Sequence, residues 1–132
     1  MQMESQSEYP GSIVKTLYLL MQLSKKAYGK YLQNKIYLHA LAIRSSNQKV
    51  YDHLLRHLPG WPDAIQDEAL DLLNHYDIWM AQFSEFAAVK KPALADEFVF
   101  HHLDQLSAFP KAAEQKIFDY YHSIKNQETT VK

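Results

Sequence analysis

The feature that most constrains the fold of this chain is a run of apolar residues spaced alternately four and three positions apart. Its members are Ile65, Ala69, Leu72, Tyr76, Trp79, Phe83 and Phe86. A mean spacing of about 3.5 residues places these side chains on one face of a long α-helix. Such a face is stable only when other helices cover it. We therefore predict an all-α fold, an antiparallel (up-and-down) four-helix bundle.

Turn-forming residues mark the ends of the first two predicted helices. The first helix begins after Ser12 and ends at Gly29, because glycine adopts the left-handed conformation that closes many helices. A continuous helix through Gly29 is the alternative, at a cost of only about 1 kcal/mol. The second helix covers residues 30–58 and ends before Pro59. Within it, the Ser-Ser-Asn sequence at residues 45–47 favours a break or a bend.

The third predicted helix contains the apolar run described above. Asp63 is its expected N-cap residue, and the Lys-Lys-Pro sequence at residues 90–92 ends it. The last helix covers residues 93–107 and is kinked or split at Pro110, after which it continues over residues 112–124. These four segments make up the predicted bundle.

Composition and length indicate one domain. Of the 132 residues, 47% are hydrophobic and 22% are charged, which is typical of a globular chain. We expect a single helical domain over residues 12–126, a disordered tail at 1–11 and a loose tail at 127–132. The most apolar stretch, residues 16–23, is far shorter than the ~20 residues that cross a bilayer, so we expect no membrane insertion.

The chain contains no cysteine. This excludes a disulfide framework, zinc sites made of thiolates and cysteine nucleophiles. It also fits a reducing compartment, and we expect a cytoplasmic protein. No glycine-rich phosphate loop occurs, and no serine or threonine lies in a recognisable catalytic motif. We therefore expect a protein without enzymatic activity.

Two sets of residues predict metal binding as an alternative function. If the bundle is antiparallel, His39, Glu85 and His102 lie at one level and point inward, where they could hold a divalent metal. His53 and His57 stand four residues apart on one helical face, which is a second, weaker metal pair. Core histidines with hydrogen-bonded neighbours, and surface histidines at a helix end, are the competing interpretations. No cofactor is required by the sequence.

A further alternative is binding of single-stranded nucleic acid around Gly29. Lysines could contact phosphates there, and tyrosines could stack on bases. The residues concerned are Lys25, Lys26, Tyr28, Lys30, Tyr31 and Lys35. The whole chain has only two arginines and a pI near 6.6, so nucleic acid is a less favoured partner.

Surplus apolar residues support the main functional hypothesis. Trp61 lies in a turn. Phe98 and Phe100 flank Val99, so apolar side chains point to more than one side of the segment at residues 98–100, and residues 17–21 show the same feature. Residues 1–62 contain eight Lys and Arg and three Asp and Glu, which gives a net charge of +5. Residues 63–132 contain six Lys and Arg and twelve Asp and Glu, which gives −6. We expect a helical interaction module with Trp61, Phe98 and Phe100 at its interface, forming a homodimer or binding a partner protein.

Overall fold

The computed structural model describes the backbone of residues 10–99 and 111–131 and the side chains of residues 11–99 and 111–125. Over these residues the chain forms four packed α-helices and no strand, which confirms the predicted all-α bundle. The helices are α2 (Pro10–Gln33), α3 (Tyr37–Arg56), α4 (Gln66–Lys90) and α6 (Lys111–Val131). Two short 3₁₀ helices, η1 (Leu58–Gly60) and η2 (Asp63–Ile65), connect α3 to α4.

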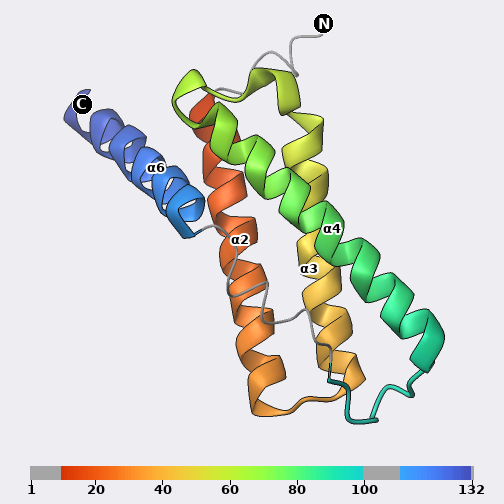
Figure 1. Ribbon diagram of the computed structural model, residues 1–132. Helices are drawn as coiled ribbons and strands as arrows, with labels where there is room; N and C mark the ends of the chain where they lie inside the picture. Colours follow the sequence, from red (N-terminus) through yellow and green to blue (C-terminus); the bar gives the residue numbers. More distant parts are fainter. Residues whose placement is uncertain (1–9, 100–110, 132) are drawn as a thin grey trace, which may run out of the picture.

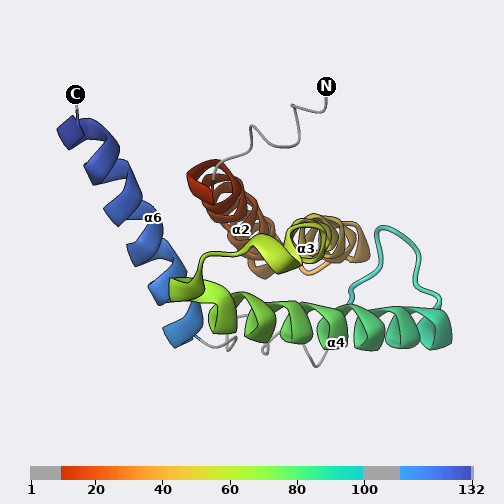
Figure 2. The same cartoon turned by 90° about the horizontal axis from the view of Figure 1, so that it is seen from above.

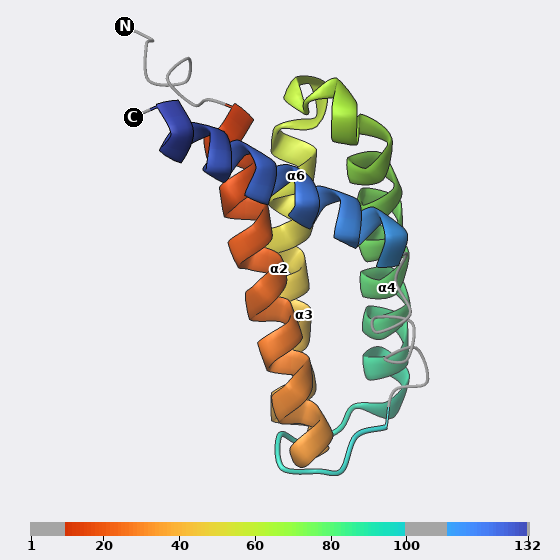
Figure 3. The same cartoon turned by 90° about the vertical axis from the view of Figure 1, so that its left-hand side faces the viewer.

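The helices are arranged so that each one packs against its neighbours in the chain, and α6 closes the bundle by packing on α2. The first two helices, α2 and α3, lie side by side and run in opposite directions (Figure 1). Seen from above, α4 lies beneath this pair and α6 at one side (Figure 2). Figure 3 shows α6 lying diagonally across the N-terminal halves of α2 and α4 instead of parallel to them.

The apolar run that opened the sequence argument forms the centre of the core. Ile65, Ala69, Leu72, Tyr76, Trp79 and Phe83 are all at most 2% exposed, and only Phe86, at the end of the run, is half-buried. The other helices supply the residues that cover it, including Leu17 and Met21 from α2 and Ile43 and Leu54 from α3. The prediction from the four-and-three spacing is therefore confirmed at side-chain level.

Three predicted helix boundaries are wrong in the first half of the chain. The first helix continues through Gly29 to Gln33, which is the alternative of a continuous helix, and it buries Tyr31 on its core face. It already includes Pro10, so Ser12 is not its N-cap. Consequently the second helix starts at Tyr37 instead of residue 30. The predicted break at residues 45–47 does not occur, since Asn47 points into the bundle.

Other boundaries differ near the turns. Asp63 begins the 3₁₀ helix η2 and is not the N-cap of α4, which starts at Gln66 without a side-chain cap. The end of α4 is as predicted: Lys91 takes the left-handed conformation with φ 46° and its N–H donates to the carbonyl of Ala87. The last helix extends to Val131, past the predicted domain end at Asn126.

The segment at residues 91–99 is not helical, so the helix predicted to start at residue 93 is wrong over its described part. Instead the segment returns to the start of α3, which has no side-chain cap. The N–H groups of Tyr37 and Leu38 donate to the carbonyls of Asp96 and Leu94, each at 2.9 Å. These carbonyls satisfy donors that the first turn of a helix leaves unpaired. Phe100, His102 and the kink predicted at Pro110 lie outside the described residues.

None of the described helices is long and apolar enough to cross a membrane.

Candidate functional site

A layer of polar side chains crosses the bundle, with three buried members and a fourth, half-buried one on α6. Its members are Ser24 on α2, Asn47 on α3, Tyr76 on α4 and Glu114 on α6. The hydroxyl of Ser24 donates a hydrogen bond to Oδ1 of Asn47, and Ser24 also hydrogen-bonds the side chain of Tyr76. Ser24, Asn47 and Tyr76 are each at most 2% exposed. We call these four residues the polar layer.

The electrostatics of the polar layer centre on Glu114. Burial raises the pKa of this carboxyl above its ordinary range, while Lys25, whose Nζ lies 3.6 Å from Oε1, and Lys111 oppose the shift. Burial raises the pKa of the Tyr76 hydroxyl far more strongly, and the negative charge of Glu114 adds to this shift. Tyr76 therefore remains a neutral hydrogen-bond donor at every physiological pH.

One polar atom in this layer is unusual. Nδ2 of Asn47 is buried and has no hydrogen-bond partner among the described residues. The sequence contained a signal for this site, because Asn47 continues the apolar spacing of Ile43, Val50 and Leu54 on the core face of α3. Ser24 carried the same kind of signal, because it lies seven residues after Leu17 and three after Met21 on the buried face of α2, but this pattern does not identify its partner.

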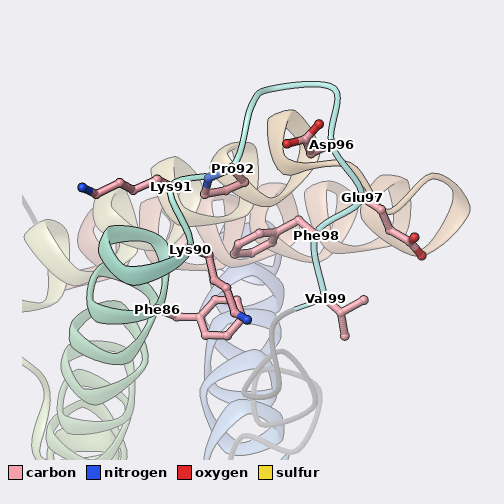
Figure 4. A pocket seen from close by; sticks show the side chains of 8 residues that line it. All are labelled: Phe86, Lys90, Lys91, Pro92, Asp96, Glu97, Phe98 and Val99. Carbon is pink, nitrogen blue, oxygen red and sulfur yellow. The ribbon is translucent and has the colours of Figure 1, made fainter.

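A second feature is an open pocket of about 540 Å³ where the segment 91–99 leaves α4. The rings of Phe86 and Phe98 form one side of it, with centroids 5.3 Å apart and planes at 72° (Figure 4). Lys90 extends over the Phe86 ring, with Nζ 5.8 Å from its centroid. Lys91, Pro92, Asp96, Glu97 and Val99 complete the lining. The pocket thus has an aromatic floor and a rim with charges of both signs.

Exposed apolar side chains gather around the same end of the bundle, where α2 ends, α3 begins and α4 ends. Five of the ten large apolar residues that are strongly exposed in the described part of the chain lie there, each at least half exposed. They are Leu32, Leu38, Val89, Leu94 and Val99. Backbone pairing brings Leu38 and Leu94 together. We call this surface the 91–99 end.

Two of the three predicted interface residues belong to the core of the chain itself. Trp61 is 3% exposed, and its indole N–H donates to the carbonyl of Leu54, which closes the C-terminal end of α3. Phe98 is 2% exposed and packs against Phe83 and Phe86. Trp61 is covered by its own chain, and Phe98 exposes only the small part of its ring that lines the pocket. Phe100, the third, lies outside the described residues.

The first predicted metal set does not come together in the described part of the chain. His39 is half-buried at the start of α3, where Nδ1 lies 2.8 Å from the carbonyl oxygen of Asn34. Glu85 is exposed on α4, so its predicted inward orientation is wrong, and His102 lies outside the described residues. No group of three or more potential ligands able to hold a metal occurs among the residues that the structure describes.

The second predicted metal pair has a structural position at the opposite end of the bundle. His53 is 8% exposed, and its Nε2 donates to the carbonyl of Ile13 at 2.8 Å, linking α3 to the first turns of α2. The ring of His57 lies 4.7 Å from that of His53, and both rings pack edge-on against Trp61. His53 is thus a buried hydrogen-bonding residue, not a surface one.

The residues predicted to contact nucleic acid do not form a turn. They lie along the continuous C-terminal part of α2, apart from Lys35. Tyr31 is 2% exposed and its hydroxyl donates to the carbonyl of Phe98, while Tyr28 packs against the core. The Tyr31 ring is therefore not available for stacking on bases, and the Tyr28 ring is partly covered. Lys25 is paired with Glu114 and lies over the ring of Phe118; Lys26, Lys30 and Lys35 are exposed.

Comparison with known proteins adds no functional information. No protein-family model matches the sequence, and no significant match was found among curated proteins or among solved structures.

Proposed function

We propose that this protein is a non-enzymatic helical interaction module that self-associates through the 91–99 end. The observation that carries the proposal is the concentration of half-exposed apolar side chains at this end of the bundle, where Val99 also lines the open pocket. Contiguous exposed apolar surface on a protein is commonly covered by another chain. The segment that supplies Leu94 and Val99 is also fixed to the start of α3 by backbone hydrogen bonds, so the surface is preformed.

The distribution of charge supports a second copy of the same chain as the partner. Lys90 and Lys91 line the pocket on one side of Pro92, and Asp96 and Glu97 line it on the other (Figure 4). A two-fold dimer brings the same surface of both subunits together, so a rim that carries both signs of charge can be complementary to itself. Under such symmetry the lysines of one subunit would meet the acids of the other.

The alternatives receive less support from the described residues. A metal site made of His39, Glu85 and His102 would require an inward Glu85, and this residue is exposed. Stacking on nucleic-acid bases would require free rings at Tyr28 and Tyr31, but Tyr31 is buried and Tyr28 is half-buried against the core. We place the action of the module in the cytoplasm, which a cysteine-free chain fits.

Sedimentation velocity over a range of micromolar concentrations tests the proposal. We expect the protein to sediment as a dimer or as a monomer–dimer equilibrium. A double variant, Leu94→Glu with Val99→Glu, places two charges in the apolar surface and should be monomeric. The matched control is Ile78→Glu, which alters a similarly exposed apolar residue on α4 far from this end, and which should associate like the parent protein. A parent protein that is monomeric throughout would overturn the proposal.

A further inference from the structure

Two of the four charged residues that line the pocket at the 91–99 end have contacts within their own chain. Nζ of Lys90 lies over the ring of Phe86, 5.8 Å from its centroid. Oδ2 of Asp96 accepts a hydrogen bond from the N–H of Ala93 at 2.9 Å. These contacts hold both side chains locally, so they are less available to another molecule.

The other two charged residues of the pocket, Lys91 and Glu97, have no such contact. Both are exposed, and neither forms an ion pair or a side-chain hydrogen bond with any residue that the structure describes. The charged residues beside α6 differ in this respect, since Lys25 pairs there with Glu114. The ammonium group of Lys91 and the carboxylate of Glu97 are therefore available to a partner molecule.

The backbone of the 91–99 segment determines which side chains face outward. Glu97 forms an isolated antiparallel bridge with Ile36, and the N–H of Phe98 donates to the carbonyl of Lys35 at 2.9 Å. Side chains alternate between the two faces of a segment paired in this way. Phe98 is 2% exposed and faces the core, whereas Glu97 and Val99 on either side of it are exposed. An acidic and an apolar side chain thus share the outer face.

Lys91 and Glu97 lie on opposite sides of the aromatic floor of the pocket. In Figure 4 their side chains point away from each other, Lys91 to the left and Glu97 to the right, with the rings of Phe86 and Phe98 between them. The surface therefore has an apolar centre with a positive charge at one side and a negative charge at the other. This arrangement is the one that a rotation by half a turn makes complementary to itself.

We propose that Lys91 of each subunit pairs with Glu97 of a second copy of the chain, so that these two residues determine the register of the dimer and the choice of partner. This inference rests on the proposed self-association through the 91–99 end. A two-fold axis through the aromatic centre exchanges the two sides of the pocket. It brings each lysine to the glutamate of the other subunit, and the pairing occurs twice in the dimer.

The role of these charges is selective more than adhesive. Exposed ion pairs contribute little to affinity, and the apolar side chains around Val99 supply most of the attraction. Two like charges that face each other across an interface disfavour association, and such repulsion excludes wrong partners and wrong registers. Reversing one of the two charges should therefore have a larger effect than neutralising it.

Reversal of one charge at a time gives the first part of the test. Lys91→Glu places two acids opposite each other at both symmetry-related positions, and Glu97→Lys places two bases there. Each variant should weaken self-association about tenfold, as measured by sedimentation velocity. The deficit should shrink in strong salt, because the screening length falls from about 10 Å at about 0.1 M salt to about 3 Å at about 1 M.

Combination of the two reversals gives the second part. An equimolar mixture of Lys91→Glu and Glu97→Lys restores both opposite-charge pairs in the mixed dimer, which should exceed its random proportion and bind as tightly as the parent dimer. The double variant Lys91→Glu with Glu97→Lys should self-associate like the parent protein but exclude it from mixed dimers. Native mass spectrometry with one partner isotopically labelled measures these proportions. Such recovery separates the pairing from a folding defect, which neither combination would rescue.

The matched control is Lys49→Glu, which makes the same change of charge at an exposed position on α3 outside this end and should associate like the parent protein. If the parent protein is monomeric throughout, the proposed self-association fails and the pairing fails with it. If the parent protein associates, three results overturn the pairing alone: single variants that associate as well as the parent, a control that is weakened as much as they are, or no recovery in either combination.

Discussion

At the scale of single residues, the informative feature is the polar layer, because it places hydrogen-bonding groups where apolar ones would pack. Asn47 is fully buried, and its Oδ1 accepts from Ser24 while Nδ2 lacks a partner among the described residues. A buried donor without a partner destabilises a fold. Polar residues in a helical core can instead favour one arrangement of helices over others, and we suggest this role for Asn47.

The hydrogen bond between Ser24 and Asn47 gives a prediction at this scale. Ser24→Ala removes the donor to Oδ1 of Asn47 and the contact with Tyr76, so it should lower the free energy of unfolding by about 1–3 kcal/mol. The double variant Ser24→Ala with Asn47→Leu removes both polar groups, and should recover most of this loss. Urea denaturation of these two variants and of Asn47→Leu alone measures these effects. Additive losses in the double variant would show that the two side chains do not interact.

At the scale of elements, the sequence predicted the helices that carry their own periodic pattern and failed at their ends. The spacing from Ile65 to Phe86 fixed α4 because each step returns to the same face. The segment 91–99 could not be predicted in this way. Its conformation depends on the uncapped start of α3, which lies more than 50 residues earlier in the chain and whose N–H groups donate to the carbonyls of Leu94 and Asp96.

The same reasoning applies to the candidate sites. Asn47 and its partner Ser24 each continue the apolar spacing of their own helix, but neither pattern shows that the two side chains meet. Only the packing of α2 against α3 brings them together. Conversely, Phe98 was predicted to be available to a partner because a local segment cannot show that a distant aromatic cluster will cover it.

Gly29 provides a prediction at the scale of one helix. It lies within α2, is exposed, and has an ordinary helical conformation, and a Cβ atom added there would meet nothing within 4 Å. Glycine destabilises a helix interior relative to alanine, so Gly29→Ala should raise the free energy of unfolding by about 1 kcal/mol. Thermal and urea denaturation test this. A loss of stability would indicate that the chain turns at Gly29, as the sequence had suggested.

At the scale of the whole molecule, the two ends of the bundle have different characters. One end is closed by Trp61, which packs against His53 and His57 and caps the last turn of α3. The 91–99 end combines exposed apolar side chains with the pocket between Phe86 and Phe98. This asymmetry is the basis for assigning self-association to the 91–99 end, while α6 crosses the other half of the bundle (Figure 3).

The most direct test of the central claim uses the absence of cysteine from the natural sequence. Val99→Cys introduces a single thiol at the 91–99 end, and Ile78→Cys introduces one at a similarly exposed position on α4 outside it. A short bis-maleimide at low micromolar protein should convert Val99→Cys into a covalent dimer and leave Ile78→Cys monomeric. Equal yields of dimer from the two variants, or none from Val99→Cys, would contradict self-association through this surface.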